Sequence, residues 1–258
     1  MTARPFTDGD QVLLVDRKHR RYLVPLQAGA EFHSHTGVIA HDDILGATEG
    51  AVLRSSRGSM FTAFRPTLAE YVLKMPRGAQ VIYPKDLGPL LILADVFPGA
   101  RILESGVGSG ALSMSLLRAG AEVVGHEIRE DFAARATANV ETMLGTEALA
   151  RYDVRMRDAY EGIEGDDYDR VVLDLPEPWQ VVPHAAMSLR AGGIIVAYTP
   201  SIVQATRFRS ALDENGFRFA ETLEVLNRSW HVDGDAVRPD HRMVAHTAFL
   251  THARLLES

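Results

Sequence analysis

Short apolar runs alternate with polar turns over the first part of the chain. The runs Gln11 to Asp16 and Arg21 to Leu26 flank the basic turn Arg17 to Arg20, which is a hairpin signal. Further short runs separated by glycines continue to about Arg65. This pattern predicts a small β-rich domain over residues 1–65, with residues 66–258 forming a second domain.

The pattern then changes to apolar strands that alternate with helices. Strands are expected at Arg101 to Glu104, Glu122 to Glu127 and Asp153 to Arg157, with helices between them. Two continuous apolar runs typical of buried parallel strands follow, and two more strands end the chain. A polar loop, residues 229–242, joins those last two strands and is long enough to be functional or to hold a partner subunit. The order predicts a seven-stranded α/β sheet.

A glycine-rich turn joins the first of these strands to a helix. Gly106, Gly108 and Gly110 allow a sharp turn and close ligand approach, and the helix presents free N–H groups there. Glu127 lies 21 residues after Gly106, where a carboxylate meets a ribose diol in nucleotide-binding folds. The spacing fits a dinucleotide fingerprint and also a motif that binds S-adenosylmethionine (SAM). Because the acid Glu104 suits an amino group and repels a pyrophosphate, SAM is the favoured interpretation.

Two further acids follow the ends of strands. Asp158 comes directly after the third strand, and Asp174 ends the fourth strand in the segment DLPEPW. Ligands bind beyond the carboxyl ends of parallel strands, so both acids are expected in the same crevice as Gly106. The prolines after Asp174 make a rigid turn that fixes its carboxylate. The segment resembles the signature with which amino-methyltransferases hold an exocyclic amine. The structural alternatives are an N-cap of the following turn for Asp158 and backbone hydrogen bonds for Asp174.

Composition limits the class of protein. The 258 residues contain no cysteine, which excludes disulfides and thiol chemistry, and no apolar run has the length of a membrane span. No signal peptide is evident, so a cytoplasmic enzyme is expected. The net charge is −7, yet residues 1–85 carry 11 Lys and Arg against 8 Asp and Glu. The histidines His33, His35 and His41 do not complete a metal shell, and no metal is expected.

Several segments together resemble the tRNA adenine-58 N1-methyltransferases of bacteria and archaea. They are RPTLAEYVLKMPRGAQVIYPKDLG, ESGVGSGAL, DLPEPW and RPDHRMVAHTAFL, and the likeness covers nearly the whole chain. The resemblance implies an α/β fold in which a seven-stranded, mostly parallel class I methyltransferase (Rossmann-like) sheet accompanies a small N-terminal β-rich domain. It also implies SAM as cofactor, the T-loop adenine of tRNA as substrate, and a homotetramer.

The same resemblance implies the roles of individual residues. Asp174 is expected to be the catalytic acid, which orients the target adenine through its N6 amine, and Tyr83 and Tyr198 are expected to flank that base. Phe132 lies where the family approaches the cofactor, although an aromatic ring there suits the core equally. The expected cofactor site comprises Glu104, Gly106, Gly108, Ser109, Gly110, Ala111, Glu127, Phe132, Asp158, Ala159 and Asp174.

Three other functions compete with this one. A SAM methyltransferase acting on a protein or small molecule would share the core but have no use for the basic β domain. An NAD-linked oxidoreductase would be expected to carry a second substrate domain. A non-catalytic RNA-binding subunit would be expected to lack the SAM turn and the acid of DLPEPW, which this chain keeps.

Overall fold

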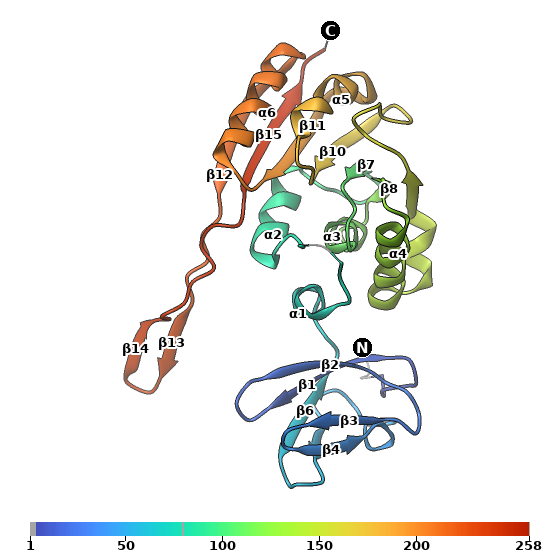
Figure 1. Cartoon of the computed structure of the whole chain (residues 1–258), viewed down its shortest axis with the longest axis vertical. Coiled ribbons are helices and arrows are strands. Elements are labelled where there is room, and N and C mark those ends of the chain that lie inside the picture. Colours follow the sequence, from blue (N-terminus) through green and yellow to red (C-terminus); the bar gives the residue numbers. More distant parts are fainter. Residues whose placement is uncertain (1–3, 79, 258) are drawn as a thin grey trace. The chain divides into compact units, whose positions relative to one another are not determined.

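The structure of the protein, a computed structural model, describes residues 4–78 and 80–257. The chain divides into two units, Met1–Met75 and Pro76–Ser258 (Figure 1). The division falls after helix α1 (Leu68–Lys74), a segment that the sequence placed with the second domain. Helix α1 contacts β2 (Arg21–Pro25), where Arg21 Nη1 lies 3.6 Å from Glu70 Oε1.

The N-terminal unit is β-rich, as the sequence predicted. Its main sheet has the order β2-β1-β6-β5, with antiparallel neighbours. The elements besides β2 and α1 are β1 (Gln11–Asp16), β3 (Glu31–Ser34), β4 (Gly37–Ala40), a 3-10 turn (His41–Asp43), β5 (Val52–Arg54) and β6 (Met60–Phe64). The predicted hairpin of β1 and β2 is confirmed. A separate hairpin of β3 and β4 accompanies the main sheet.

The basic turn between β1 and β2 is organised by Asp16. Its Oδ1 accepts hydrogen bonds from the backbone N–H groups of Lys18 (2.8 Å) and Arg20 (2.9 Å), and its Oδ2 accepts from Arg20 Nε at 2.7 Å. These bonds hold the pKa of Asp16 below its usual range against the opposing effect of desolvation. The acid therefore fixes the loop that displays Arg17 and Lys18.

The second unit contains one seven-stranded sheet with the order β12-β15-β11-β10-β7-β8-β9. Strand β15 pairs antiparallel with β11 and β12, and the other neighbours are parallel. In chain order the elements are α2 (Pro84–Leu93), β7 (Arg101–Ser105), α3 (Ala111–Arg118), β8 (Glu122–Glu127), α4 (Glu130–Leu144), a 3-10 turn (Thr146–Arg151), β9 (Tyr152–Met156), β10 (Tyr168–Leu173), a 3-10 turn (Pro178–Gln180), α5 (Val182–Ser188), β11 (Leu189–Thr199), α6 (Ile202–Glu214), β12 (Phe217–Glu224), β13 (Trp230–Asp233), β14 (Ala236–Pro239) and β15 (Phe249–Leu255).

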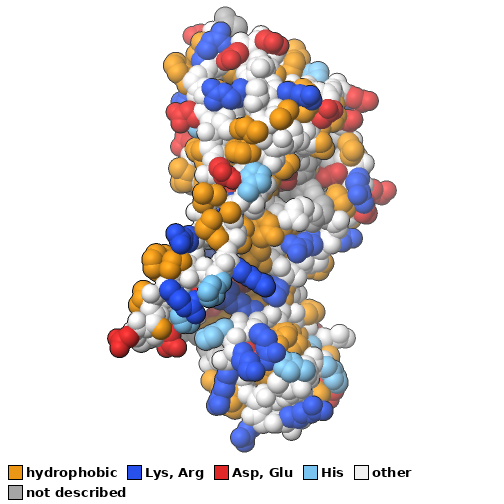
Figure 2. Space-filling model, turned by 60° about the vertical axis from the view of Figure 1, so that its left-hand side comes forward, with side chains coloured by type: hydrophobic (Ala, Val, Ile, Leu, Met, Phe, Trp, Pro, Cys, Tyr) orange, Lys and Arg blue, Asp and Glu red, His pale blue; other side chains and the backbone are white. Residues whose placement is uncertain are grey.

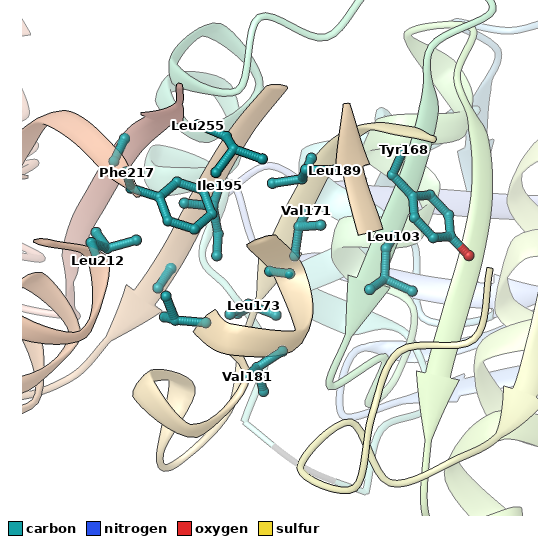
Figure 3. Close-up of a cluster of buried hydrophobic side chains, with 14 of the residues drawn as sticks. Leu103, Tyr168, Val171, Leu173, Val181, Leu189, Ile195, Leu212, Phe217 and Leu255 are labelled. Atoms are coloured by element: carbon teal, nitrogen blue, oxygen red, sulfur yellow. The ribbon is translucent and has the colours of Figure 1, made fainter. Parts of the chain in front are cut away.

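Apolar side chains pack one face of this sheet against α5 and α6. Leu103, Val171 and Ile195 from the central strands meet Val181 and Leu212 in this cluster (Figure 3). Helices α3 and α4 pack together and contact β8. The central strands are thus buried on both faces, which explains their unbroken apolar sequences. No helix in the described part of the chain is long and apolar enough to cross a membrane.

Helix α5 ends at Ser188, because β11 already begins to pair with β10 at Leu189. One detail differs from the sequence-based expectation. The expected polar loop is a two-stranded hairpin of β13 and β14 that extends from the ends of β12 and β15 (Figure 1). We call residues 225–247, which contain this hairpin, the arm.

Candidate functional site

The glycine turn between β7 and α3 packs directly onto the segment that carries Asp174. The Asp174 N–H donates to the Ser105 carbonyl at 2.9 Å. Gly106 has a φ of +86°, and a Cβ added there would lie 2.1 Å from the Asp174 carbonyl oxygen. Only glycine therefore allows this approach. The turn and the DLPEPW segment form one packed unit.

Glu127 closes the next side of the site at the end of β8. Its Oε2 accepts from the Gly108 N–H at 3.0 Å, and its Oε1 accepts from the N–H groups of Ile128 (2.9 Å) and Arg129 (3.0 Å). The side chain is only 7% exposed, so these bonds fix its carboxylate. Lone pairs remain on Oε2 for a ligand hydroxyl.

The loop after β9 brings Asp158 and Ala159 to the same edge of the sheet. Asp158 Oδ1 accepts from the Tyr160 N–H at 2.9 Å, and the Arg157 N–H donates to the Glu127 carbonyl at 3.0 Å. Tyr160 Oη accepts from the Glu177 N–H at 3.0 Å, which ties this loop to the DLPEPW segment. The three strand-end loops are therefore hydrogen-bonded to one another.

A shallow cleft opens over the glycine turn, and Asp174 is the acid that lines it. The residues around it are Gln80, Val81, Ile82, Gly106, Val107, Gly108, Ser109, Ala111, Leu112 and Asp174. Burial raises the pKa of the Asp174 carboxyl to about 7. A carboxyl poised near neutrality in a cleft marks a functional site.

Tyr83 and Tyr198 lie in the neighbourhood of Asp174. Tyr83 precedes α2 as its N-cap residue, and Tyr198 is the penultimate residue of β11. Burial raises the pKa of Tyr198 well above its usual range, and the charges of Asp174 and Asp86 and the Tyr83 hydroxyl add to this rise. These groups therefore lie within electrostatic range of one another, although neither tyrosine is among the residues that line the cleft.

Glu104 and Phe132 are not among the residues that line the cleft. Glu104 is fully buried, and burial together with the negative charge of Asp174 raises its pKa to about 8. Phe132 is 9% exposed, with the Arg129 guanidinium carbon 3.7 Å from its ring centre. Its ring also packs close to Gly78, where an added Cβ would lie 2.8 Å from Phe132 Cε1.

The residues present fit SAM. The glycine turn leaves open space at Gly108, where an added Cβ would meet nothing within 4 Å. Glu127 can accept from ribose hydroxyls, and Asp158 can accept from the exocyclic amine of adenine. Within residues 4–78 and 80–257, no three His, Asp or Glu side chains come together as a metal site would require.

Sequence reasoning missed residues 80–82, which form one wall of the cleft. Their only signal was their position directly before Tyr83. It also missed Lys85 and Asp86, whose side chains are 5% and 0% exposed and lie 2.8 Å apart. The signal there was a charged pair in the first turn of an otherwise apolar helix.

Comparisons with known proteins agree with this geometry. A family model described as "tRNA methyltransferase complex GCD14 subunit" matches residues 61–239, and a model of TrmI-like N-terminal domains matches residues 5–53. The chain belongs to the GCD14 tRNA methyltransferase family. The tRNA (adenine(58)-N(1))-methyltransferase TrmI of Thermus thermophilus is 39% identical over 246 residues, which cover 94% of this chain and 96% of that protein. The resemblance found in the sequence is confirmed.

Two solved structures have the same fold. A SAM-dependent O-methyltransferase from Thermotoga maritima gives a TM-score of 0.93 at 32% identity, covering 98% of this chain and 95% of that one. The tRNA (m1A58) methyltransferase TrmI of Aquifex aeolicus gives 0.85 at 28% identity, covering 99% and 100%. The predicted fold class, a class I methyltransferase sheet with an N-terminal β-rich part, is confirmed.

Proposed function

We propose that this protein transfers a methyl group from SAM to N1 of adenine 58 in the T-loop of tRNA. The observation that carries the proposal is Asp174, held by its backbone over the glycine turn with a pKa near neutrality. The family supports it, since the Thermus thermophilus relative is named a tRNA (adenine(58)-N(1))-methyltransferase. A relative from Methanocaldococcus jannaschii, 32% identical over 94% of each chain, is named for adenines 57 and 58.

The chemistry asks little of the protein beyond alignment. Bound SAM supplies an activated methyl group on a positively charged sulfur, and N1 of adenine has an in-plane lone pair to receive it. Asp174 would accept a hydrogen bond from the N6 amine, which orients the ring and stabilises the positive charge that N1-methylation creates. Tyr83 and Tyr198 would bracket the base after it leaves the T-loop stack, at a cost of a few kcal/mol.

Mapping of the methylated base tests the proposal. Unmodified tRNA is incubated with the protein and labelled SAM, digested, and analysed by mass spectrometry. We expect one 1-methyladenine at position 58, and no label in tRNA that carries guanine there. Label in the protein or small-molecule fraction of an extract, with none in tRNA, would contradict the proposal.

The raised pKa of Asp174 predicts an acid limb in the rate. The ionised carboxylate is the active form, so kcat/KM for SAM should rise with pH and reach a plateau, with the midpoint of the rise near pH 7. Saturating SAM should move the kcat midpoint lower, because its positive charge favours the ionised acid. Rate profiles from pH 5.5 to 9 measure both. Glu104→Gln removes the other carboxyl whose pKa is raised, and it should keep the loss of rate at low pH. The residual rate of Asp174→Asn should not show this loss.

The N-terminal unit would contact the tRNA backbone. Figure 2 shows Lys and Arg side chains spread over its visible surface. Arg17, Lys18 and Arg20 line a groove of about 230 Å³. Because Arg20 is bonded to Asp16 and Arg21 to Glu70, Arg17 and Lys18 are the residues to replace.

Arg17→Ala with Lys18→Ala should weaken tRNA binding while leaving kcat unchanged. Each lost phosphate contact reduces the slope of log affinity against log salt by about 1. Titrations of labelled tRNA at several salt concentrations measure this slope. An unchanged slope would remove these two side chains from the interface.

We also propose that the protein forms a homotetramer. It would work in the cytoplasm, where its tRNA substrate is found, and it would need no metal. The arm supports assembly, because Trp230, Val232 and Val237 are more than half exposed on its hairpin. Light scattering should give four times the chain mass of 28.3 kDa. Turnover should be unaffected by EDTA.

A second candidate is methylation of an oxygen on a small molecule or protein. It is favoured by the name of the Thermotoga maritima structure, an O-methyltransferase. In that case Asp174 would act as a base toward a hydroxyl group. Recovery of the label as a methyl ether or ester in the mapping experiment would select this candidate.

A further inference from the structure

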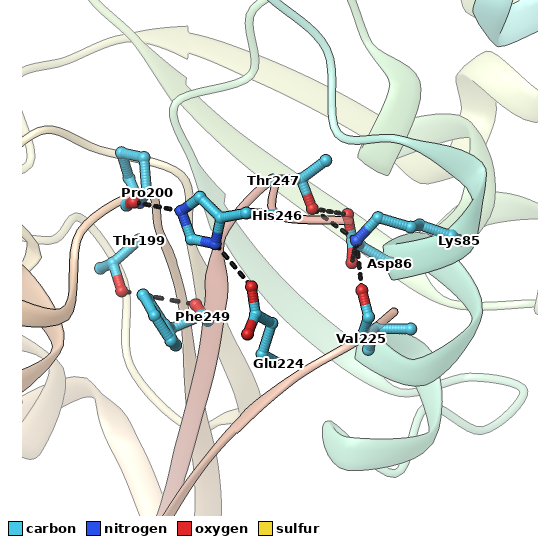
Figure 4. A network of polar contacts seen from close by, with 9 residues as sticks. All are labelled: Lys85, Asp86, Thr199, Pro200, Glu224, Val225, His246, Thr247 and Phe249. Carbon is cyan, nitrogen blue, oxygen red and sulfur yellow. Dashed lines mark hydrogen bonds and ion pairs between the residues drawn. The ribbon is translucent and has the colours of Figure 1, made fainter. Parts of the chain in front are cut away.

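A buried charged cluster joins three separate segments beside the proposed adenine pocket. Lys85 Nζ donates to Asp86 Oδ1 (2.8 Å), to the Val225 carbonyl (2.6 Å) and to Thr247 Oγ1 (2.6 Å). Thr247 Oγ1 in turn donates to Asp86 Oδ2 at 2.7 Å. All three donors of the ammonium are used, and Figure 4 shows these groups converging from α2 and from both ends of the arm.

A second polar contact lies beside the first at the base of the arm. His246 Nδ1 is 2.6 Å from Glu224 Oε1, and its Nε2 is 2.8 Å from the Pro200 carbonyl (Figure 4). The bond with Glu224 and that with Pro200 raise the pKa of His246. This contact connects the arm to the end of β11, two residues after Tyr198.

The segments joined in this way carry both pocket tyrosines. Lys85 and Asp86 lie in the first turn of α2, directly after its N-cap residue Tyr83. Tyr198 pairs with Leu250 of β15, three residues after Thr247, and the Thr247 side chain is near enough to oppose the effect of burial on the tyrosine pKa. The Thr247 side chain therefore bonds the α2 carboxylate and lies near Tyr198.

Stability alone does not account for a buried ion pair at this place. Moving two charges out of water costs several kcal/mol each, and well-packed apolar residues often serve the fold as well or better. What the charges provide is a fixed geometry, because each donor and acceptor has a set direction. Near a pocket that must align a base with a methyl group, such geometry has a direct use.

We propose that Lys85, Asp86 and Thr247 are positioning residues that set Tyr83 and Tyr198 for the target base. Seating the arm completes the cluster, because the arm supplies Val225 and Thr247. Contacts made by the arm are thereby transmitted to the adenine pocket. The inference rests on the proposed function and adds residues that act through the tyrosines and do not touch the substrate themselves.

Replacement of Thr247 tests the inference on the full-length protein. Thr247→Val keeps the side-chain shape and removes the hydroxyl, so kcat on tRNA should fall about tenfold, the effect of one lost directing hydrogen bond. The Kd for SAM, measured by calorimetry, should stay within twofold. Thr247→Ser restores the hydroxyl and should recover at least half of the rate.

Two further variants separate positioning from a general loss of structure. Thr251→Val removes another buried hydroxyl four residues further along the chain, one that is hydrogen-bonded to Thr222, and should leave kcat unchanged. In a protein that already carries Tyr198→Phe, adding Thr247→Val should lower kcat far less than Thr247→Val does alone. The reason is that the phenol through which Thr247 acts has been removed. Full additivity of the two losses, or an equal loss in Thr251→Val, would overturn the inference.

The outcome also distinguishes this inference from the proposed function. No label transfer to tRNA by the unsubstituted protein overturns both. Normal transfer by the unsubstituted protein, with an undiminished rate in Thr247→Val, overturns the positioning role alone.

Discussion

Replacing Asp174 with alanine is expected to abolish methylation while leaving the SAM affinity within a few-fold. Asp174 is the acid that lines the cleft, and its removal takes away the acceptor for the N6 amine and the negative charge near the developing cation. Loss of one such electrostatic group typically lowers kcat by about 10²–10³-fold. Single-turnover rates on unmodified tRNA and calorimetric SAM titration measure the two quantities separately.

Glu177→Ala is the matched control for this substitution. Glu177 lies in the same DLPEPW segment, is exposed, and bonds Gln180 through its side chain. Its hydrogen bond to Tyr160 Oη is donated by the backbone N–H, which alanine keeps. We therefore expect near-normal turnover from Glu177→Ala. Near-normal turnover from Asp174→Ala would remove Asp174 from the catalytic role.

The sequence predicted the parts of the fold that depend on local patterns. Unbroken apolar runs identified the parallel strands, and the acids after them, Glu127, Asp158 and Asp174, come to one edge of the sheet as expected. The glycines identified the turn itself. These features follow from the spacing of residues along the chain, so they require no knowledge of distant contacts.

The sequence did not predict features that depend on contacts between residues far apart in the chain. The acid at the end of the first strand, Glu104, is fully buried, and the charges of Asp174 and Glu127 add to burial in raising its pKa, which no local pattern indicates; its contact with the cofactor amine stays a prediction. The arm was read as a loop, because its two strands are only four residues long and pair with each other instead of joining the main sheet. The cluster of Lys85, Asp86 and Thr247 joins residues about 160 positions apart, a separation that no local pattern encodes.

Replacing Gly106 with alanine should disrupt the whole site. The added Cβ would lie 2.1 Å from the Asp174 carbonyl oxygen, at a φ of +86° that side chains other than glycine rarely adopt. The two nearest atoms belong to the Asp174 backbone, so the collision cannot be relieved by moving a side chain. Strain and overpacking together predict a loss of at least about 3 kcal/mol in the free energy of unfolding. SAM binding and methylation should fail together, unlike the selective loss in Asp174→Ala.

Gly99→Ala separates the collision from the strain of the backbone. Gly99 has a similar φ of +81°, but an added Cβ there would meet nothing within 4 Å. It should cost only the strain, about 1–2 kcal/mol, and leave SAM affinity and turnover unchanged. Thermal unfolding with and without SAM compares the two variants. If Gly106→Ala has the same unfolding temperature and the same SAM affinity as Gly99→Ala, the turn can move away from Asp174. The two halves of the site are then not one packed unit.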